Sequence, residues 1–523
     1  MMSAELGLSI VATIDLCLKY GKEVRNMCSA LKNAEIEIEE RTLRLENGCF
    51  RCMAQLQFLQ RADYMMDDDH RALLKRTLRM LVEKLSDVHS ILENLIELRV
   101  GYGSAGAKEY TAKRLKYAFK KDKLDGAINV LETWQQISDP SWFLVMRMSD
   151  RRIDEALVGQ PQIQESIPSV LAIRRGSQHA SLANNDSMQL ALPATDLDQT
   201  RIEEIMFSEV KLINNTGPDG MKTYVLDRVG SSIIGLEART KKNTRNLARR
   251  LQHDEPQNFG LLSCKGFVEK GDPSVLGAPT DFTLVFRVPP GLTSPQSLRY
   301  YLLGKKLSSL SHRFSIAQQL ARSVTYVHIF GFVHKNVRPE NVLGFSEQGN
   351  QTPLTFLVGF KDFRMEEGHT EKHGDSDLEK NLYHHPTRQG ASPRSEFIMQ
   401  HNIYSLGVCL LEIGLWQSFI QYDRQNENPA LSEEFKVLCD APEEHMAMFL
   451  LMSVKDRLVE LARSKLCEHM GDEYSRIVET CLTCLDPDNA DFGDPREFED
   501  EDGIRVGVRY IEKVLQRLDS LKV

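Results

Sequence analysis

Apolar residues in the first third of the chain recur at helical spacing. Between residues 74 and 95 they follow alternating steps of four and three, the heptad pattern of a helix that packs against other helices. The residues of this seam are Leu74, Leu78, Leu81, Leu85, Val88, Leu92 and Leu95. No strand-like alternation of useful length precedes residue 145, so we predict an all-α helical bundle over residues 1–150.

The helical pattern is interrupted by the glycine-rich run GYGSAG at residues 101–106. Glycine disfavours a regular helix, so we expect the long helix to end at Gly101. The strongly basic segment from Lys108 onward is expected to resume as a helix. A basic run of this kind is typical of a solvated face, and the alternative is contact with anionic lipid headgroups.

Residues 151–200 lose this periodicity and are rich in Gln, Ser, Asn, Ala and Pro. Such a segment buries little apolar surface, so we predict a flexible linker. Within it, Arg174, Arg175 and Ser177 form an R-R-x-S sequence, which basophilic kinases often accept. Ser177 is therefore a candidate phosphosite, although short matches of this kind also arise by chance in linkers.

Residues 201–523 combine strand and helix patterns. The segment LINNTGPDGMKTYVLDRV predicts two strands joined by a tight turn. The segment SHRFSIAQQLARSVTYVHIFGFVHKN predicts a long helix whose buried stripe is Ile316, Leu320, Val324 and Val327. The chain is thus expected to be multidomain, with an all-α bundle followed by an α+β domain.

Charge and composition exclude several classes of protein. The formal net charge of -9 argues against a general nucleic-acid binder, and the 41% hydrophobic and 27% charged residues are typical of a globular protein. Glu5 and Asp15 do not fit a signal peptide, and the apolar stretch from Leu6 to Leu18 is too short to span a membrane. We expect a cytoplasmic protein, with recruitment to the membrane periphery left open.

The ten cysteines are expected to be reduced and mostly buried. Two C-x-x-C pairs occur, Cys49 with Cys52 and Cys481 with Cys484. Neither pair has a second cysteine pair or a suitably spaced histidine pair that would complete a zinc site. We therefore predict no metal site.

The segment GFVHKNVRPENVLGF, residues 331–345, carries the strongest chemical signal. Its spacing resembles the catalytic loop H-R-D-x-x-x-x-N of protein kinases, which implies a bilobal kinase-like fold. In that family the Asp accepts the proton of the substrate hydroxyl, whereas Asn336 has no basic site near neutral pH. The degenerate loop positions are His334, Asn336, Arg338 and Asn341. The resemblance implies a domain that does not transfer phosphate efficiently, and we assign no catalytic residue.

The other kinase motifs are also altered. The D-F-G position is occupied by Gly359, Phe360 and Lys361, and glycine has no carboxylate to bind Mg²⁺. The glycine-rich phosphate loop is missing, and the lysine of V-A-I-K has only Lys222 and Arg228 as nearby replacements. We expect no cofactor, with weak ATP binding left open.

A basic segment, ARTKKNTRNLARR at residues 238–250, occupies the place of the kinase C-helix. It has no glutamate for the usual ion pair with the lysine. We interpret it as a solvated basic face, with docking of an acidic partner as the alternative.

Two stretches near the ends of the bundle, GLSIVATIDLCLKYGKEV and LETWQQISDPSWFLVM, resemble fungal HeLo-type domains. These are helical bundles of signalling and heterokaryon incompatibility proteins, and the resemblance implies membrane association and regulated cell death. It also implies membrane-contacting residues on the first helix; the alternative is that this helix packs within the bundle. The candidates are Leu6, Leu8, Ile10, Val11, Ile14, Leu16 and Leu18.

These resemblances favour a signalling pseudokinase in which a kinase-like domain controls a helical effector bundle. The same order of domains occurs in the mixed lineage kinase domain-like protein, which is an analogy of architecture. Two alternatives stay open, a kinase with a non-standard ATP site and residual Ser/Thr transfer, and a protein-binding scaffold without membrane activity. The expected partners are proteins and an anionic membrane that meets residues 1–150, with oligomerisation through the bundle left open and no nucleic acid.

Overall fold

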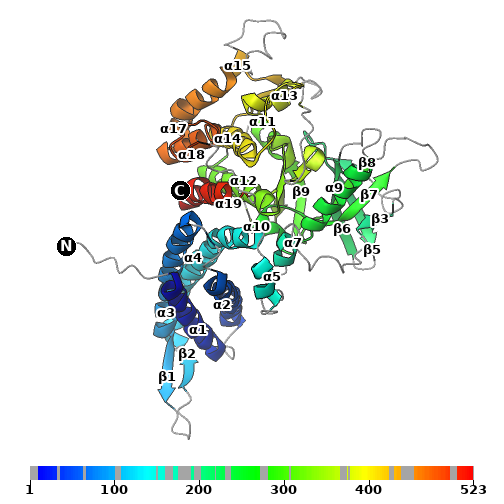
Figure 1. Ribbon diagram of the computed structural model, residues 1–523. Coiled ribbons are helices and arrows are strands. Elements are labelled where there is room, and N and C mark those ends of the chain that lie inside the picture. Colours follow the sequence, from blue (N-terminus) through cyan, green and yellow to red (C-terminus); the bar gives the residue numbers. More distant parts are fainter. Residues whose placement is uncertain are drawn as a thin grey trace. The chain divides into compact units, whose positions relative to one another are not determined.

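The computed structural model divides into two compact units, Met1–Leu171 and Ala172–Val523 (Figure 1). The structure describes residues 10–31, 36–62, 66, 68–100, 108–112, 114–148, 151–158, 169–174, 190–193, 202–217, 220–229, 237–270, 281–304, 308–350, 352–365, 374, 377–422, 429–436, 453–494 and 503–521.

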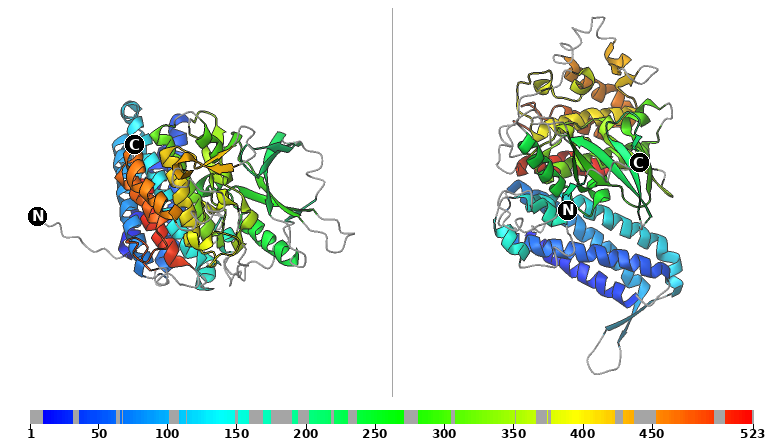
Figure 2. Two further views of the ribbon diagram at one scale, coloured as in Figure 1. Left: turned by 90° about the horizontal axis from the view of Figure 1, so that it is seen from above. Right: turned by 90° about the vertical axis from the view of Figure 1, so that its right-hand side faces the viewer.

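The first unit is built on four long helices that run side by side (Figure 2). The predicted heptad seam lies in the third helix, and its members from Leu74 to Leu92 are buried, which confirms the seam. The side chain of Leu95 lies outside the described ones. The helices are α1 (Ile10–Leu31), α2 (Ile36–Ala62), α3 (Asp68–Leu95), α4 (Arg114–Arg147), α5 (Arg151–Val158) and α7 (Ser169–Arg174).

A β-hairpin corrects the expectation of an all-α bundle. Strands β1 (Ile96–Val100) and β2 (Lys108–Ala112) pair antiparallel and are inserted between α3 and α4. The helix therefore ends at Leu95, before Gly101, and the basic segment begins as a strand. Ile96, Leu98 and Val100 do alternate with polar residues, but a five-residue alternation directly after a heptad seam was too short to be recognised as a strand.

The predicted linker, residues 151–200, contains three described elements. Helix α5 belongs to the first unit, and α7 spans the division between the units. Strand β3 (Ala191–Leu192) pairs parallel with β7 (Ser263–Lys270) in the second unit. Ser177 lies outside the described residues.

The second unit is a mixed α/β structure with a six-stranded sheet. The strand order is β3-β7-β8-β6-β5-β4, and all pairs except β3–β7 are antiparallel. The predicted hairpin is confirmed by β5 and β6, which pair from Lys211 with Leu226 to Gly217 with Gly220. The remaining strands of this sheet are β4 (Ile202–Glu204), β5 (Lys211–Gly217), β6 (Gly220–Val229) and β8 (Asp281–Arg287).

Helices and short strands complete the second unit. The predicted stripe on α12, from Ile316 to Val327, is buried as expected, and every residue of α14 is buried. The helices are α9 (Glu237–Arg250), α10 (Pro256–Phe259), α11 (Leu298–Leu303), α12 (Leu310–Ile329), α13 (Leu378–Asn381), α14 (Met399–Leu415), α15 (Glu433–Lys436), α17 (Cys467–Met470), α18 (Asp472–Leu482), α19 (Ile504–Tyr510) and α20 (Gln516–Ser520). The strands are β9 (Leu292–Ser297), β10 (Phe332–Val333), β11 (Val342–Glu347), β12 (Leu354–Leu357), β13 (Arg364–Met365), β14 (Ile420–Tyr422) and β15 (Pro429–Leu431).

Candidate functional site

The segment from His334 to Asn341 is a buried loop held by its own hydrogen bonds. The backbone N–H of Asn336 donates to Nδ1 of His334 at 3.3 Å, and Nδ2 of Asn341 donates to the carbonyl of Asn336 at 2.8 Å. Burial lowers the pKa of His334 to about 3. The histidine is therefore neutral near pH 7 and shapes the loop without carrying charge.

Two helices fix this loop from outside. Asn402 on α14 accepts the backbone N–H of Lys335 at 3.1 Å. Glu340 in the loop pairs with Arg299 on α11 at 3.0 Å, and Arg299 also pairs with Glu412 on α14 at 2.7 Å. Removing one member of such a buried group is costly because it leaves a charge unpaired. The position of the loop is thus strongly specified.

Gly359 directly precedes a 3-10 turn, η4 (Phe360–Asp362), and lies against the loop. Its φ of 84° falls in the left-handed region, and a Cβ atom at this position would lie 2.3 Å from Cγ of Asn341. Any side chain here would have to displace Asn341 as well as adopt a strained backbone. The geometry therefore requires glycine and leaves no room for a metal-binding carboxylate at this position.

Asp227 on β6 is a site residue that the sequence analysis missed. Its carboxylate accepts the backbone N–H groups of Gly359 at 2.7 Å and Phe360 at 3.0 Å. Burial raises the pKa of Asp227 to about 7, although the two N–H donors act in the opposite direction. A signal was present in the sequence, because Val225, Asp227 and Val229 alternate on one face of a strand and the flanking valines are buried.

A second missed carboxylate pairs with two cations of the site. Glu209 lies 3.1 Å from Nη2 of Arg338 and 3.3 Å from Nζ of Lys361. Arg338 is buried, whereas Glu209 and Lys361 are exposed. Burial alone would raise the pKa of Glu209, but the charges of Arg338 and Lys361 outweigh it and the pKa lies below its ordinary value.

Glu209 belongs to a short connection, residues 205–210, which we call the strap. The hydroxyl of Ser297 donates to the carbonyl of Met206 at 2.7 Å. The ring of Phe207 lies 4.7 Å from that of Tyr422, and Phe207 has a positive φ of 58°. The strap therefore links the start of the sheet to the end of β9, to β14 and, through Glu209, to the loop.

The structure brings the predicted degenerate positions together. The ring of His334 lies 4.9 Å from that of Phe360, and Nδ2 of Asn336 donates to the carbonyl of Gly359 at 3.4 Å. Both candidate replacements for the lysine are exposed. Lys222 is exposed near the start of β6, and Arg228 is exposed and pairs with Asp281 at 2.7 Å.

The described candidate membrane residues lie on α1, and most of them are buried or half-buried. Ile10 and Ile14 are buried, Leu16 and Leu18 are half-buried, and Val11 is exposed. Leu6 and Leu8 lie outside the described residues. No helix in the described parts of the chain combines the length and the apolar character needed to cross a membrane.

Within the described ranges, no three His, Cys, Asp or Glu side chains are grouped as metal ligands. Both C-x-x-C pairs are buried, and the described cysteines are free thiols. Burial raises the pKa of Cys49 to about 12 and that of Cys52 further, so these two side chains behave as apolar core residues.

Comparison with known proteins leaves the family of the chain open. No protein-family model matches the sequence, and no curated protein matches it either. The residues of the site therefore carry the functional argument.

Proposed function

We propose that the chain is a signalling pseudokinase in which a kinase-like domain, residues 201–523, controls a HeLo-like helical effector bundle, residues 1–150. The observation that carries this proposal is a pair of hydrogen bonds, in which the carboxylate of Asp227 accepts the backbone N–H groups of Gly359 and Phe360. This contact supports the proposal because it occupies backbone N–H groups at the D-F-G position, which are then not available to a phosphate. A second acid, Glu209, forms ion pairs with Arg338 and Lys361. These two cations could otherwise bind a phosphate group.

Loss of the general base supports the same reading. Asn336 is buried, and its amide nitrogen donates to the carbonyl of Gly359. A positioned general base contributes roughly 100- to 10,000-fold in rate. Without this base, and without a metal carboxylate at position 359, residual Ser/Thr transfer is the weaker alternative.

Nucleotide binding tests the pseudokinase directly. We expect Mg²⁺-ATP at millimolar concentration to leave the melting temperature of the full chain unchanged and radiolabelled ATP to give no transfer to the chain or to a basic substrate protein. The variant N336D should remain inactive, because it restores the base without the metal ligand. Transfer by the wild-type chain that N336D accelerates would instead support a kinase with a non-standard site.

The effector role rests on the first helix. Because Ile10 and Ile14 are buried, contact of these side chains with a bilayer requires α1 to leave its position among the helices. Release of α1 is therefore the step that the second unit would control. A protein partner or phosphorylation is the proposed trigger.

Dye release from anionic liposomes tests this role. Residues 1–171 alone should cause leakage, and the full chain should cause less. The variant I14E on residues 1–171 reports whether the apolar face of α1 carries the effect, and L43E, which makes the same kind of change at an exposed position of α2, is its control. If neither the fragment nor the full chain binds lipid, the protein-binding scaffold becomes the better account.

A further inference from the structure

Helix α9 carries three cations that have no acidic partner among the described residues. Lys242, Arg245 and Arg249 are spaced i, i+3 and i+7, so their side chains emerge on one face of the helix. Lys242 and Arg245 are exposed, and Arg249 is half-buried. Lys241 pairs with Glu269 at 2.6 Å, so this acid is already engaged outside the three cations. We call Lys242, Arg245 and Arg249 the basic row.

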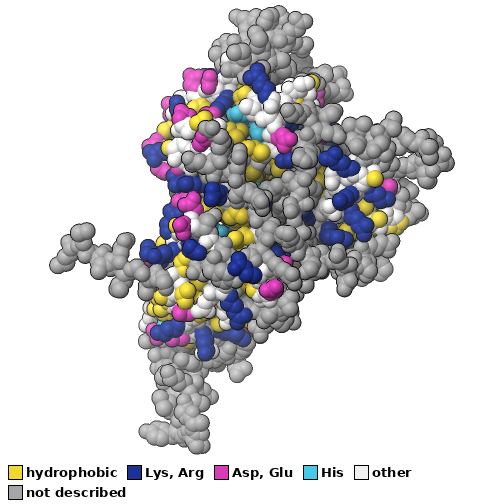
Figure 3. All heavy atoms as spheres, in the orientation of Figure 1, with side chains coloured by type: hydrophobic (Ala, Val, Ile, Leu, Met, Phe, Trp, Pro, Cys, Tyr) yellow, Lys and Arg dark blue, Asp and Glu magenta, His cyan; other side chains and the backbone are white. Residues whose placement is uncertain are grey.

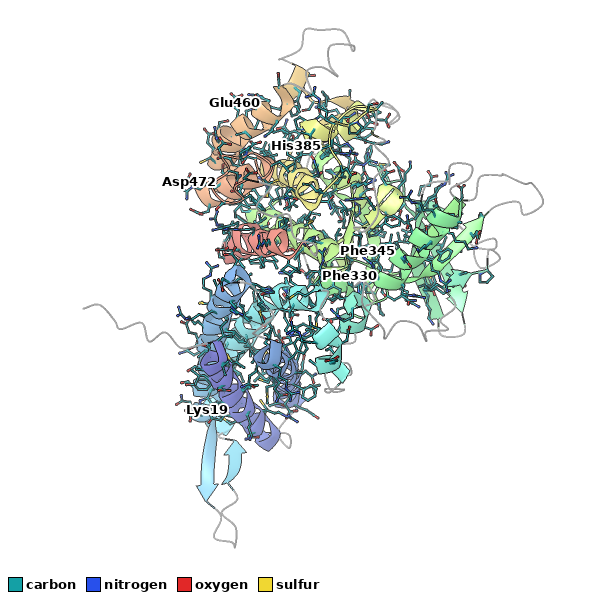
Figure 4. All side chains as sticks on the ribbon, viewed as in Figure 1. Lys19, Phe330, Phe345, His385, Glu460 and Asp472 are labelled. Carbon is teal, nitrogen blue, oxygen red and sulfur yellow. The ribbon has the colours of Figure 1, made fainter. Side chains whose placement is uncertain are left out.

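The opposite face of α9 is fixed to the protein. Leu247 and Ala248 are completely buried. Arg250 donates to the carbonyls of Phe330 at 2.9 Å and Gly331 at 2.6 Å, where α12 ends, and Phe330 is labelled in Figure 4. A helix held in this way presents its outer side chains in a fixed register, which lowers the entropy lost when a partner binds.

The charge of this surface is opposite to that of the whole chain. Figure 3 shows Lys and Arg side chains gathered where Figure 1 draws α9. The helix contains six cations and a single acid, Glu237, although the chain has a formal net charge of -9. A local field of this kind attracts an anionic partner and accelerates its association.

The surroundings decide which anionic partner fits. None of the large apolar side chains that are exposed in the described residues belongs to α9, so the helix has nothing to insert into a bilayer. Three cations can also neutralise only a few phosphates, which gives nucleic acid a weak attraction that salt screens readily. The remaining class of anionic partner is a protein that carries a few acidic side chains at regular spacing.

We propose that the basic row is a docking surface for an acidic helical segment of a partner protein. The row extends over about 10 Å along the helix axis. Carboxylates at positions i, i+3 and i+7 of a partner helix have the same rise, so each cation can meet one carboxylate. The proposal does not depend on the kinase-like assignment of the second unit.

An alanine-based helical peptide with glutamates at positions 2, 5 and 9 is the probe. Its binding to the full chain is followed by fluorescence anisotropy at low salt and again at about 0.3 M salt, where screening is stronger. We expect saturable binding that weakens at least tenfold at the higher salt. The double variant K242E/R249E should weaken it at least tenfold at low salt, and K242Q/R249Q should have a smaller effect.

The matched control is R79E/K123E, which makes the same change of net charge at exposed helical positions of the first unit. This control should bind the peptide like the wild-type chain, and circular dichroism verifies that all variants are folded. If K242E/R249E and R79E/K123E lost binding equally, the effect would come from the net charge of the chain and the proposal would be overturned. The proposal would also be overturned if a peptide with glutamines in place of the glutamates bound equally well. Tighter binding of anionic vesicles or of single-stranded DNA through the basic row would overturn it as well.

Discussion

At the scale of single residues, Asp227 determines the chemistry of the candidate site. Its carboxylate occupies two backbone donors and is almost completely buried, with a pKa raised to about 7 by that burial. A carboxyl group with a raised pKa stays protonated in the folded chain at pH values where it ionises in the unfolded chain. The stability of the second unit should therefore depend on pH.

The variant D227N tests this dependence. The Asp227 carboxyl contributes stability below about pH 4, and this contribution is lost as the pH rises through about 7. The amide oxygen of Asn can accept both backbone N–H groups and does not titrate. We expect the melting temperature of wild-type to fall more between pH 5 and pH 8 than that of D227N. The control is D488N at an exposed position, and an unchanged pH dependence in D227N would contradict the assignment.

The residues of the loop could be predicted from the sequence, whereas the acids that contact the site, Glu209 and Asp227, could not. The loop from His334 to Asn341 was recognisable because its members are close in sequence. Glu209 lies 129 residues before Arg338 and 152 before Lys361, and no local pattern links residues so far apart. Asp227 had a local signal, but a lone carboxylate in a strand is recognisable as buried only when the face of the strand is known.

At the scale of elements, the strap is anchored at both ends and meets the site through an exposed acid. Ile205 and Val210 at its ends are buried, and its other contacts include one hydrogen bond to Ser297, one ring contact to Tyr422 and the ion pairs of Glu209. Phe207 also stores backbone strain, because a positive φ is unfavourable for a residue with a Cβ atom. Weakening one contact should therefore affect the strap without unfolding the unit.

The variant E209Q should open the strap more often. It removes the negative charge that pairs with the buried Arg338 and the exposed Lys361. Glu209 itself is exposed, and ion pairs with a solvent-exposed partner contribute about 1 kcal/mol or less. We expect amide hydrogen exchange in residues 205–210 to become roughly two- to fivefold faster. E204Q is the control, since Glu204 forms an exposed pair with Lys211 outside the strap. Unchanged exchange in E209Q would mean that the strap does not depend on these ion pairs.

Helices were the elements that the sequence predicted best. The seam of α3 and the stripe of α12 each repeat over several turns, so tertiary contacts reinforce the local pattern. The hairpin of β1 and β2 has only five residues in each strand and was missed. Short strands are fixed by pairing with a partner strand, and a single stretch of sequence does not reveal that pairing.

At the scale of the whole molecule, the first unit extends beyond the predicted end of the bundle. It reaches Leu171, and Ile153, Leu157 and Val170 are fully buried. These side chains lie in α5 and α7, both of which begin after residue 150. Burying a large aliphatic side chain contributes about 1.5–3 kcal/mol.

We therefore expect the fragment 1–171 to be several kcal/mol more stable than the fragment 1–150. Urea unfolding followed by circular dichroism at 222 nm measures the difference. A fragment 1–171 in which Ile153 and Leu157 are replaced by alanine separates the effect of burial from that of chain length. Its free energy of unfolding should be close to that of the fragment 1–150. Equal stability of all three fragments would place the end of the folded unit at residue 150.

The contact between Gly359 and Asn341 also bears on how this chain can evolve. An acid at position 359 would need a different backbone angle and a displaced Asn341, and Asp227 already occupies the amides on either side of the position. A single mutation that introduces the acid therefore yields a less stable protein with no gain of chemistry. Substitutions around the site can therefore accumulate, but no single substitution can introduce a working metal ligand at residue 359.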